Sequence, residues 1–200
     1  DRWIPHLHFE LRRRNLPPDN WCYKRPEQRT EVFRDYWHPS EFIKINRPGL
    51  LPVMIEADDN SNTFNRATSD QWHESGIGLG GDTLWAYEQT TQEHCWAEWR
   101  PRLTETGIYE IMAFVPQENA TATQARYAIH YRGGVEIRLV DQSQYYDEWV
   151  SLGRFPCSTV SAMPTWVRLS DQTGDPHLDD MNRRKKIAFD AMSFIRVGAM

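Results

Sequence analysis

The sequence predicts an all-β protein, a β-sandwich or jelly roll, on three observations. Short apolar runs of strand length recur from residue 53 onward, and turn-forming residues separate them. Several runs alternate apolar and polar residues, which is typical of antiparallel strands with one buried face. No convincing amphipathic helix lies between them. Together these patterns indicate antiparallel sheets without a helical layer.

The alternation is clearest in residues 125–131, where Tyr127, Ile129 and Tyr131 alternate with Arg126 and His130. Side chains two positions apart share a face of a strand, so one face of this segment is apolar. The same reasoning, applied along the chain, gives the full set of predicted strands: 53–55, 84–87, 95–99, 109–115, 125–131, 135–140, 149–152, 166–169 and 188–197.

Two glycines link the runs 125–131 and 135–140. Gly133 and Gly134 can supply the positive φ values that a primed two-residue turn needs, so this pair predicts a β-hairpin. Residues 58–82 form the one long stretch without a strand pattern, and we expect a loop there. Long ordered loops are often functional or bind a metal ion.

Charge and hydropathy exclude several classes of protein. A formal net charge of -5 argues against a general nucleic-acid binder, and no segment has the apolar length of a membrane span. The chain starts at Asp1 without a signal-peptide pattern, so we expect it to be processed, truncated or incomplete. The basic run 183–186 is interpreted as a solvated turn before the final strand, with contact to an acidic polymer as the alternative.

The three cysteines leave disulfide formation open. Cys95 and Cys157 both fall in predicted strands and could pair, whereas buried free thiols are the alternative. The sequence assigns no partner to Cys22.

The segment Pro5-His6-Leu7-His8-Phe9-Glu10 places two imidazoles on one side of a presumed strand, a geometry that zinc hydrolases use. Together with the stretch 37–43, it resembles the last strand and exit segment of a LytM-type, lysostaphin-like zinc metalloendopeptidase. The resemblance implies that His8 is a zinc ligand and that His6 is the catalytic histidine assisting the attacking water.

The same resemblance implies an incomplete zinc site. The family's other ligands, a histidine and an aspartate well upstream, have no counterpart in this sequence, and catalytic zinc takes three protein ligands. We therefore expect no peptidase activity from this chain alone, and zinc endopeptidase activity only if an upstream half is present.

A second resemblance spans about residues 53–197. Its phrases follow one another in a set order, among them Ile55-Glu56-Ala57-Asp58, Ala97-Glu98-Trp99-Arg100-Pro101, Tyr127-Ala128-Ile129-His130-Tyr131 and Phe189-Asp190-Ala191-Met192. In that order they resemble the golvesin C-terminal-like domain, which is also found in xanthan lyase-like proteins. The resemblance implies a galactose-binding-like jelly roll over residues 52–198, appended to a peptidase-like fragment at 1–50, with no catalytic residues to carry over.

Nine tryptophans in 200 residues suggest aromatic platforms, because exposed aromatic faces stack on sugar rings. Trp99 and Trp149 lie inside strand phrases and are expected to pack in the core. The remaining aromatic residues near the long loop or in a late turn are the candidate ligand-binding residues: Trp72, Trp85, Trp96, Tyr145 and Tyr146.

Acidic residues open the first strand of this domain and lie in the last one. Glu56, Asp58 and Asp190 could converge if these strands are neighbours, and carboxylate oxygens suit Ca²⁺. Acidic residues that are solvated or cap turns are the simpler alternative.

The sequence thus leads to an extracellular or cell-surface module that binds a polysaccharide or peptidoglycan and is not itself catalytic. Two alternatives stay open. One is part of a zinc endopeptidase, and the other is a structural subunit whose exposed aromatic residues contact other surface proteins.

Overall fold

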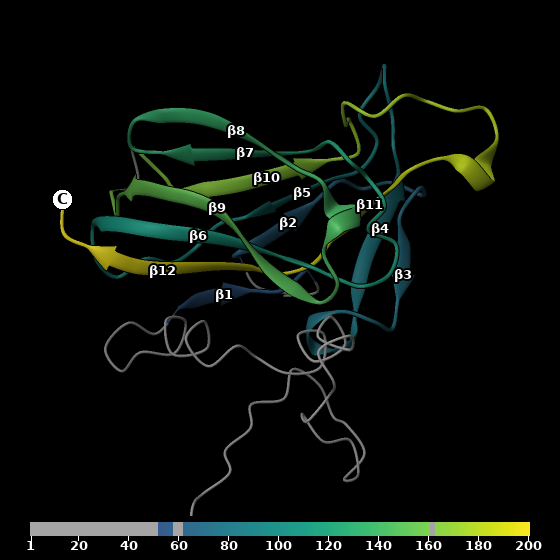
Figure 1. The fold of residues 1–200 in the computed structure, drawn as a ribbon. Coiled ribbons are helices and arrows are strands. Elements are labelled where there is room, and N and C mark those ends of the chain that lie inside the picture. The colour runs from purple at the N-terminus through teal and green to yellow at the C-terminus, as the bar shows by residue number, and fades with distance from the viewer. Residues whose placement is uncertain (1–51, 58–61, 161–162) are drawn as a thin grey trace, which may run out of the picture. The chain divides into compact units, whose positions relative to one another are not determined.

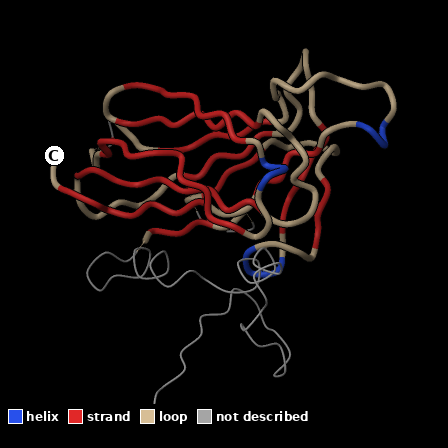
Figure 2. Tube along the Cα trace, in the orientation of Figure 1, coloured by secondary structure: helices blue, strands red, loops and turns tan. Residues whose placement is uncertain are grey.

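The computed structural model describes residues 52–57, 62–160 and 163–200, all within the compact unit that spans residues 50–200. In these residues, twelve strands form three sheets of antiparallel strands that loops connect, and the helical segments are single 3₁₀ turns (Figure 1, Figure 2). The expected all-β sandwich is confirmed. The N-terminal extension proposed from the sequence lies outside the described residues.

The two larger sheets form the two layers of the sandwich (Figure 1). One has the strand order β1-β12-β6-β9, with bounds Val53–Ile55, Met192–Gly198, Gly107–Val115 and Glu148–Cys157. The other, which we call the large sheet, has the order β2-β5-β10-β7-β8, with bounds Phe64–Arg66, Trp96–Trp99, Trp166–Ser170, Ala125–Tyr131 and Gly134–Val140.

A third sheet, which we call the small sheet, lies at one end of the sandwich, on the right in Figure 1. Its order is β11-β4-β3, with bounds Lys186–Phe189, Thr83–Tyr87 and His73–Ser75. Only Asp190 and Ala191 separate β11 from β12, so the chain passes directly from the small sheet into the four-stranded one.

Aromatic and aliphatic side chains from all three sheets fill one core. Trp99 on β5 and Phe194 on β12 are both fully buried, as are Tyr127 on β7 and Phe189 on β11. The indole nitrogen of Trp99 donates a hydrogen bond to the Asp190 carbonyl at 3.1 Å. This bond ties the large sheet to the link between β11 and β12.

A buried glutamine joins further elements. Gln142 opens the 3₁₀ segment η3 (Gln142–Gln144), and its side-chain amide donates to the Tyr127 hydroxyl and the Ala188 carbonyl, both at 2.9 Å. Its side-chain oxygen accepts from the Ala188 amide at 3.0 Å. Because every polar group of this fully buried side chain has a partner, its burial carries no penalty for an unmade hydrogen bond.

The predicted hairpin forms with a different turn. Tyr131 pairs with Gly134, so the connecting residues are Arg132 and Gly133. Of the two glycines, only Gly134 has a positive φ, 135°, and it begins β8 rather than occupying the turn. The expectation of two positive φ values in a primed turn was therefore wrong.

Two short strands occupy the stretch predicted to be one long loop. β2 pairs with β5, and β3 pairs with β4, each over three residue pairs. Both are polar, with sequences FNR and HES, so they lack the apolar alternation that marks a strand in the sequence. The longer strands with which they pair, β5 and β4, carry the buried apolar side chains.

The predicted strands 149–152 and 188–197 also have different limits. β9 continues to Cys157 because its register against β6 shifts between Ile111 and Met112, which accommodates Gly153 at φ 120° as part of a bulge. The second stretch is divided by Asp190 and Ala191 into β11 and β12, which belong to different sheets.

Cys95 and Cys157 are buried free thiols. Burial raises the pKa of each thiol to about 11, so both are protonated at neutral pH and poorly reactive. Cys22 lies outside the described residues. In the described part of the chain, no helix has the length and apolar character to cross a bilayer.

Candidate functional site

The outward side of the large sheet carries a connected set of aromatic and charged side chains. They point outward because the alternate residues of the same strands, such as Ala97, Val167 and Ile129, are buried in the core. We call this set the large-sheet face and define it as Trp96, Glu98 and Arg100 on β5 and just after it, Trp166 and Arg168 on β10, and His130 on β7.

One row of the large-sheet face runs across three neighbouring strands. Trp166 pairs with His130 in the register of β10 with β7, and their rings stack at a centroid distance of 3.4 Å and an angle of 10°. The Arg100 guanidinium lies 4.7 Å from the Trp166 ring centroid, and it comes from the strand on the other side of β10. Trp166 is therefore held in one orientation between a cation and an imidazole.

The second row is built around Glu98, which is only 5% exposed. One of its carboxylate oxygens accepts hydrogen bonds from Arg100 at 2.5 and 3.1 Å, and the other accepts from Arg168 at 2.7 Å. Arg168 also donates to Glu93 at 2.5 Å, and its guanidinium lies 4.3 Å from the Trp96 ring centroid. Glu98 thus holds both guanidinium groups against the tryptophans.

The charges of the large-sheet face balance. Two arginines face the carboxylates of Glu98 and Glu93. Burial lowers the pKa of His130, and the positive charges of Arg100 and Arg168 act in the same direction against Glu98. His130 is therefore neutral at pH 7, and the large-sheet face offers fixed hydrogen-bonding groups without a net charge.

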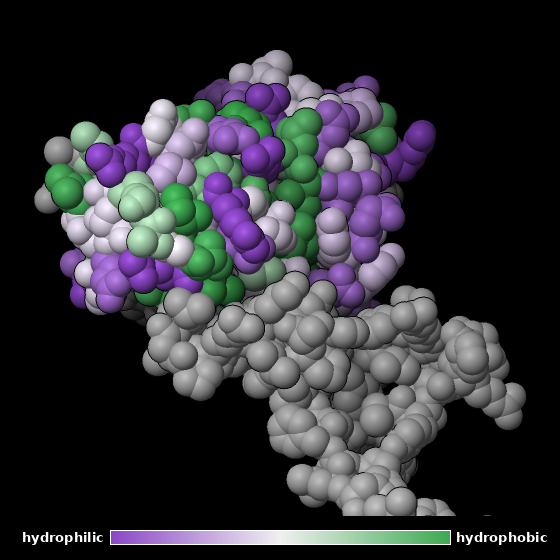
Figure 3. Space-filling view, turned by 60° about the vertical axis from the view of Figure 1, so that its left-hand side comes forward, coloured by the Kyte–Doolittle hydropathy of each residue, from purple (hydrophilic) through white to green (hydrophobic). Residues whose placement is uncertain are grey.

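Beside this face, the edge strand β8 presents an apolar stripe. Val135, Ile137 and Leu139 are 55%, 45% and 61% exposed. The register places them opposite His130, Ala128 and Arg126 of β7, so the stripe continues the outward side of the sheet. On the end of the molecule that Figure 3 brings forward, apolar residues emerge in small groups between hydrophilic ones.

A second aromatic cluster lies on the small sheet. We call it the small-sheet face and define it as His73 on β3, Trp85 and Tyr87 on β4, and Lys186 on β11. The His73 and Trp85 rings stack at 4.1 Å and 17°, and Tyr87 meets both rings edge-on at 5.7 and 5.3 Å. Three rings from two strands therefore form one aromatic surface.

The small-sheet face also carries a cation. The Lys186 ammonium lies 4.4 Å from the Trp85 ring centroid and donates to the Asn119 side-chain oxygen at 3.0 Å. The nearby Arg184 guanidinium lies 5.4 Å from the Tyr87 ring, but it also pairs at 3.2 Å with Glu88, which is fully buried. The charge of Arg184 is therefore compensated inside the protein.

The structure separates the three tryptophans that the sequence suggested as platforms. Trp96 lies on the large-sheet face and Trp85 on the small-sheet face. Trp72 packs edge-on against the buried Phe189 ring at 4.8 Å, and its indole nitrogen donates to the Ala67 carbonyl at 2.9 Å. Trp72 therefore packs against the edge of the core.

The two candidate tyrosines lie between η3 and β9. Tyr145 is partly buried and packs against the core, whereas Tyr146 is 46% exposed. Neither belongs to the two aromatic faces defined above.

The candidate calcium ligands Glu56 and Asp190 approach the same glycine-rich turn, which contains the 3₁₀ segment η2 (Leu79–Gly81). A Cβ atom at Gly80 would lie 2.7 Å from a Glu56 carboxylate oxygen, and one at Gly78 would lie 2.3 Å from an Asp190 oxygen. Asp58 lies outside the described residues, as do His6 and His8. Among the described residues, no group of three or more His, Cys, Asp or Glu side chains is arranged to hold a metal ion.

The buried carboxyl group of Asp190 makes the stability of the fold depend on pH. Burial raises the pKa of its carboxyl to about 8, and the charges of Asp82 and Glu56 act in the same direction. Because this folded-state value exceeds the unfolded value, the stabilising contribution of the group is complete below about pH 4 and is lost as pH rises through about 8. Asp190→Asn stays neutral and keeps an acceptor for Thr83 and the Leu79 amide, which now donate at 2.6 and 3.3 Å.

In buffer with a chelator, the melting temperature of Asp190→Asn is therefore expected to match that of the parent chain near pH 4 and to exceed it by a few degrees near pH 9. A variant that is less stable than the parent at both pH values would contradict this.

We propose that Ca²⁺ binds at this turn, in which case added Ca²⁺ raises the melting temperature of the parent chain and not that of the variant.

Sequence reasoning missed most members of the two faces. Trp166, Arg168 and His130 could have been found from the outward positions of their alternating strands. Nothing in the sequence indicates that Glu98 bridges two arginines or that His73 stacks on Trp85, since both contacts depend on the pairing of separate strands.

Among the solved structures similar to this chain, the Paenibacillus xanthan lyase agrees with the fold. A segment of the Paenibacillus xanthan lyase matches with a TM-score of 0.57 at 16% identity, covering 73% of this chain and 13% of that chain. The C-terminal CBM6 of a marine laminarinase from Zobellia galactanivorans matches with a TM-score of 0.46 at 11% identity, covering 72% and 99%. The CBM22-1 and GH10 modules of a Clostridium thermocellum xylanase match with a TM-score of 0.43 at 15% identity, covering 74% and 29%.

A comparison with curated proteins finds no match. The family model described as the Golvesin C-terminal domain matches residues 56–178, which is more than half of the chain. This match includes β5, β7 and β10, which carry the large-sheet face. The chain therefore belongs to the Golvesin C-terminal domain family.

Proposed function

We propose that this chain is a non-catalytic module that binds a glycan on the large-sheet face, outside the cell or at its surface. The observation that carries the proposal is the row formed by Arg100, Trp166 and His130, fixed from below by Glu98. Sugars present hydroxyl groups and apolar C–H faces, and this row offers both guanidinium N–H groups and aromatic rings.

The charge balance of the face favours a neutral glycan. A ligand with a net charge would gain little there, because each arginine already pairs with a glutamate. The context of the similar segment also supports glycan binding, since that segment belongs to a protein named as a lyase of the polysaccharide xanthan.

Equilibrium binding to a panel of neutral polysaccharides and peptidoglycan tests the proposal. We expect saturable binding of the full chain to at least one neutral polysaccharide. Uniform absence of binding at millimolar ligand would overturn the proposal.

The apolar stripe on β8 favours a second candidate function, a structural subunit of an extracellular assembly. Exposed Val135, Ile137 and Leu139 on an edge strand are typical of a surface that another protein covers. Sedimentation separates the two functions, because an assembly subunit self-associates without added sugar and Ile137→Lys reduces that association.

Attachment to a peptidoglycan-type metallopeptidase also stays a proposal. It rests on the resemblance around His6 and His8, and zinc content measured by mass spectrometry tests whether the chain holds a metal there. Zinc-free protein would exclude a working zinc endopeptidase in this chain alone.

A further inference from the structure

We infer that the small-sheet face is a second glycan site and that it takes a carboxylated sugar. This inference rests on the proposed function in that the module binds glycans, but it assigns a different surface and a different ligand chemistry. Charge distinguishes the two surfaces, since the large-sheet face is balanced while the small-sheet face carries an ammonium group held against aromatic rings.

The positive charge of Lys186 indicates the chemical class of the ligand. Within the described part of the chain, its ammonium group pairs with no carboxylate, and its one hydrogen-bond partner is the neutral side chain of Asn119. The contact with Trp85 orients this charge without neutralising it. A carboxylate is the ligand group that completes such a site.

The rings supply the rest of the site. His73, Trp85 and Tyr87 form a half-exposed aromatic surface beside Lys186, and β4, the middle strand of the sheet, holds two of the three. An aromatic surface next to a cation matches a molecule with an apolar ring face and an acidic substituent. Uronic-acid units of an acidic polysaccharide have this combination, whereas a small inorganic anion has no apolar face to pack against the rings.

The surrounding charges favour the same class of ligand. Arg183 and Lys185 flank the compensated Arg184 in the connection that leads into β11, so the small-sheet face begins directly after a basic run. These side chains raise the local concentration of an acidic polymer although the whole chain carries a net charge of -5.

The test uses two forms of one polymer on the full chain. Oligogalacturonate carries a carboxylate on every unit. Its methyl-esterified form has the same backbone, but its esters carry no charge. By calorimetry at low ionic strength, we expect the full chain to bind oligogalacturonate, with an affinity that falls as salt rises, and to bind the esterified form at least about tenfold more weakly.

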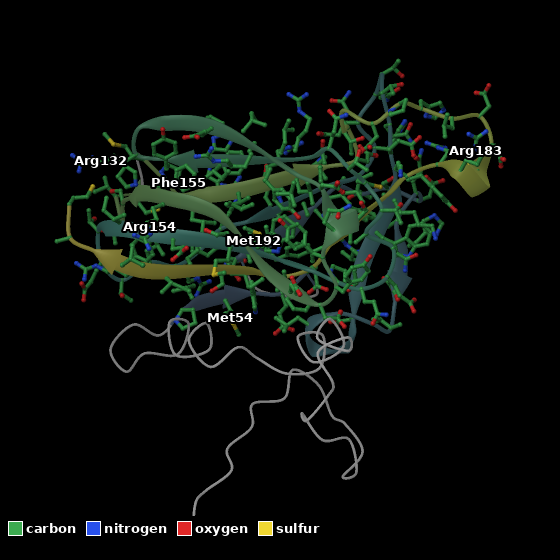
Figure 4. All side chains as sticks on the ribbon, viewed as in Figure 1. Met54, Arg132, Arg154, Phe155, Arg183 and Met192 are labelled. Carbon is green, nitrogen blue, oxygen red and sulfur yellow. The ribbon has the colours of Figure 1, made fainter. Side chains whose placement is uncertain are left out.

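Two variants locate the site. Lys186→Ala is expected to weaken oligogalacturonate binding by at least about tenfold, and Lys186→Arg is expected to retain most of it. Arg132→Ala is the matched control, since it also removes one positive charge, but at the end of the sandwich opposite Arg183 (Figure 4). It is expected to leave the affinity unchanged, as is Trp166→Ala on the large-sheet face.

Equal binding of the two polymer forms would overturn the inference, as would equal effects of Lys186→Ala and Arg132→Ala. Loss of oligogalacturonate binding in Trp166→Ala would overturn it as well, because the acidic ligand would then occupy the large-sheet face. Failure of the proposed function is a different result. In that case no neutral polysaccharide binds, whereas failure of this inference alone leaves Trp166-dependent binding of a neutral polysaccharide intact.

Discussion

Replacing Trp99 with alanine is expected to remove a large part of the stability of the sandwich. The side chain is fully buried between the sheets, and its indole nitrogen donates to the Asp190 carbonyl. Removing a buried tryptophan costs about 3–5 kcal/mol, which is a large part of the about 5–15 kcal/mol by which a domain is stable. Urea unfolding followed by circular dichroism measures the loss.

Trp96 provides the matched control, because it lies on the same strand and points to the opposite side. Trp96→Ala should shift the urea midpoint far less than Trp99→Ala does. A third variant, Trp99→Phe, keeps most of the apolar volume and removes the N–H donor, so we expect a loss of about 1–3 kcal/mol. Equal midpoints for Trp99→Ala and Trp96→Ala would contradict the description of the core.

The second large effect concerns ligand binding. Trp166→Ala removes the indole ring that both Arg100 and His130 contact, so the row loses its largest aromatic surface while Glu98 still holds Arg100. We expect the affinity for a neutral polysaccharide to fall at least about tenfold, with little change in melting temperature because Trp166 is half-exposed.

Trp149→Ala controls for the loss of a half-buried tryptophan elsewhere. Trp149 lies on β9 of the other layer, edge-on to Phe114 at 5.4 Å. Its replacement should leave affinity for the neutral polysaccharide unchanged. If both variants bind as the parent chain does, the large-sheet face is not the binding surface.

The sequence predicts those strands of the fold that carry their own apolar pattern. β1 and β7 have the predicted bounds, because Val53–Ile55 is a short apolar run and Ala125–Tyr131 alternates apolar and polar residues up to the turn. β2 and β3 escaped prediction because a short polar strand is stabilised by its neighbour rather than by its own side chains. The predicted strand 149–152 was also too short, since a bulge lets Gly153 lie within β9, which continues to Cys157.

The sequence predicted less of the candidate sites than of the fold. Trp85 and Trp96 were named from their position near a long polar stretch, yet that stretch contributes only His73 to the two faces on which they lie. The partners that define these faces come from strands far apart in sequence, as with Lys186 above Trp85 and Arg168 above Trp96. Spacing along the chain does not encode such neighbours, because they depend on sheet order.

The pairing of β1 with β12 governs when this domain can become native during synthesis. Phe194 aligns with Val53 across nearly the whole length of the domain, and β12 also lies between β1 and β6 in its sheet. Until the ribosome has released β11 and β12, β4 lacks a neighbour, the Trp99 indole lacks its acceptor and the four-stranded sheet lacks an inner strand. Sandwich closure is therefore a late event that follows translation of the last strands, and contacts this distant in sequence make it slow compared with helical domains.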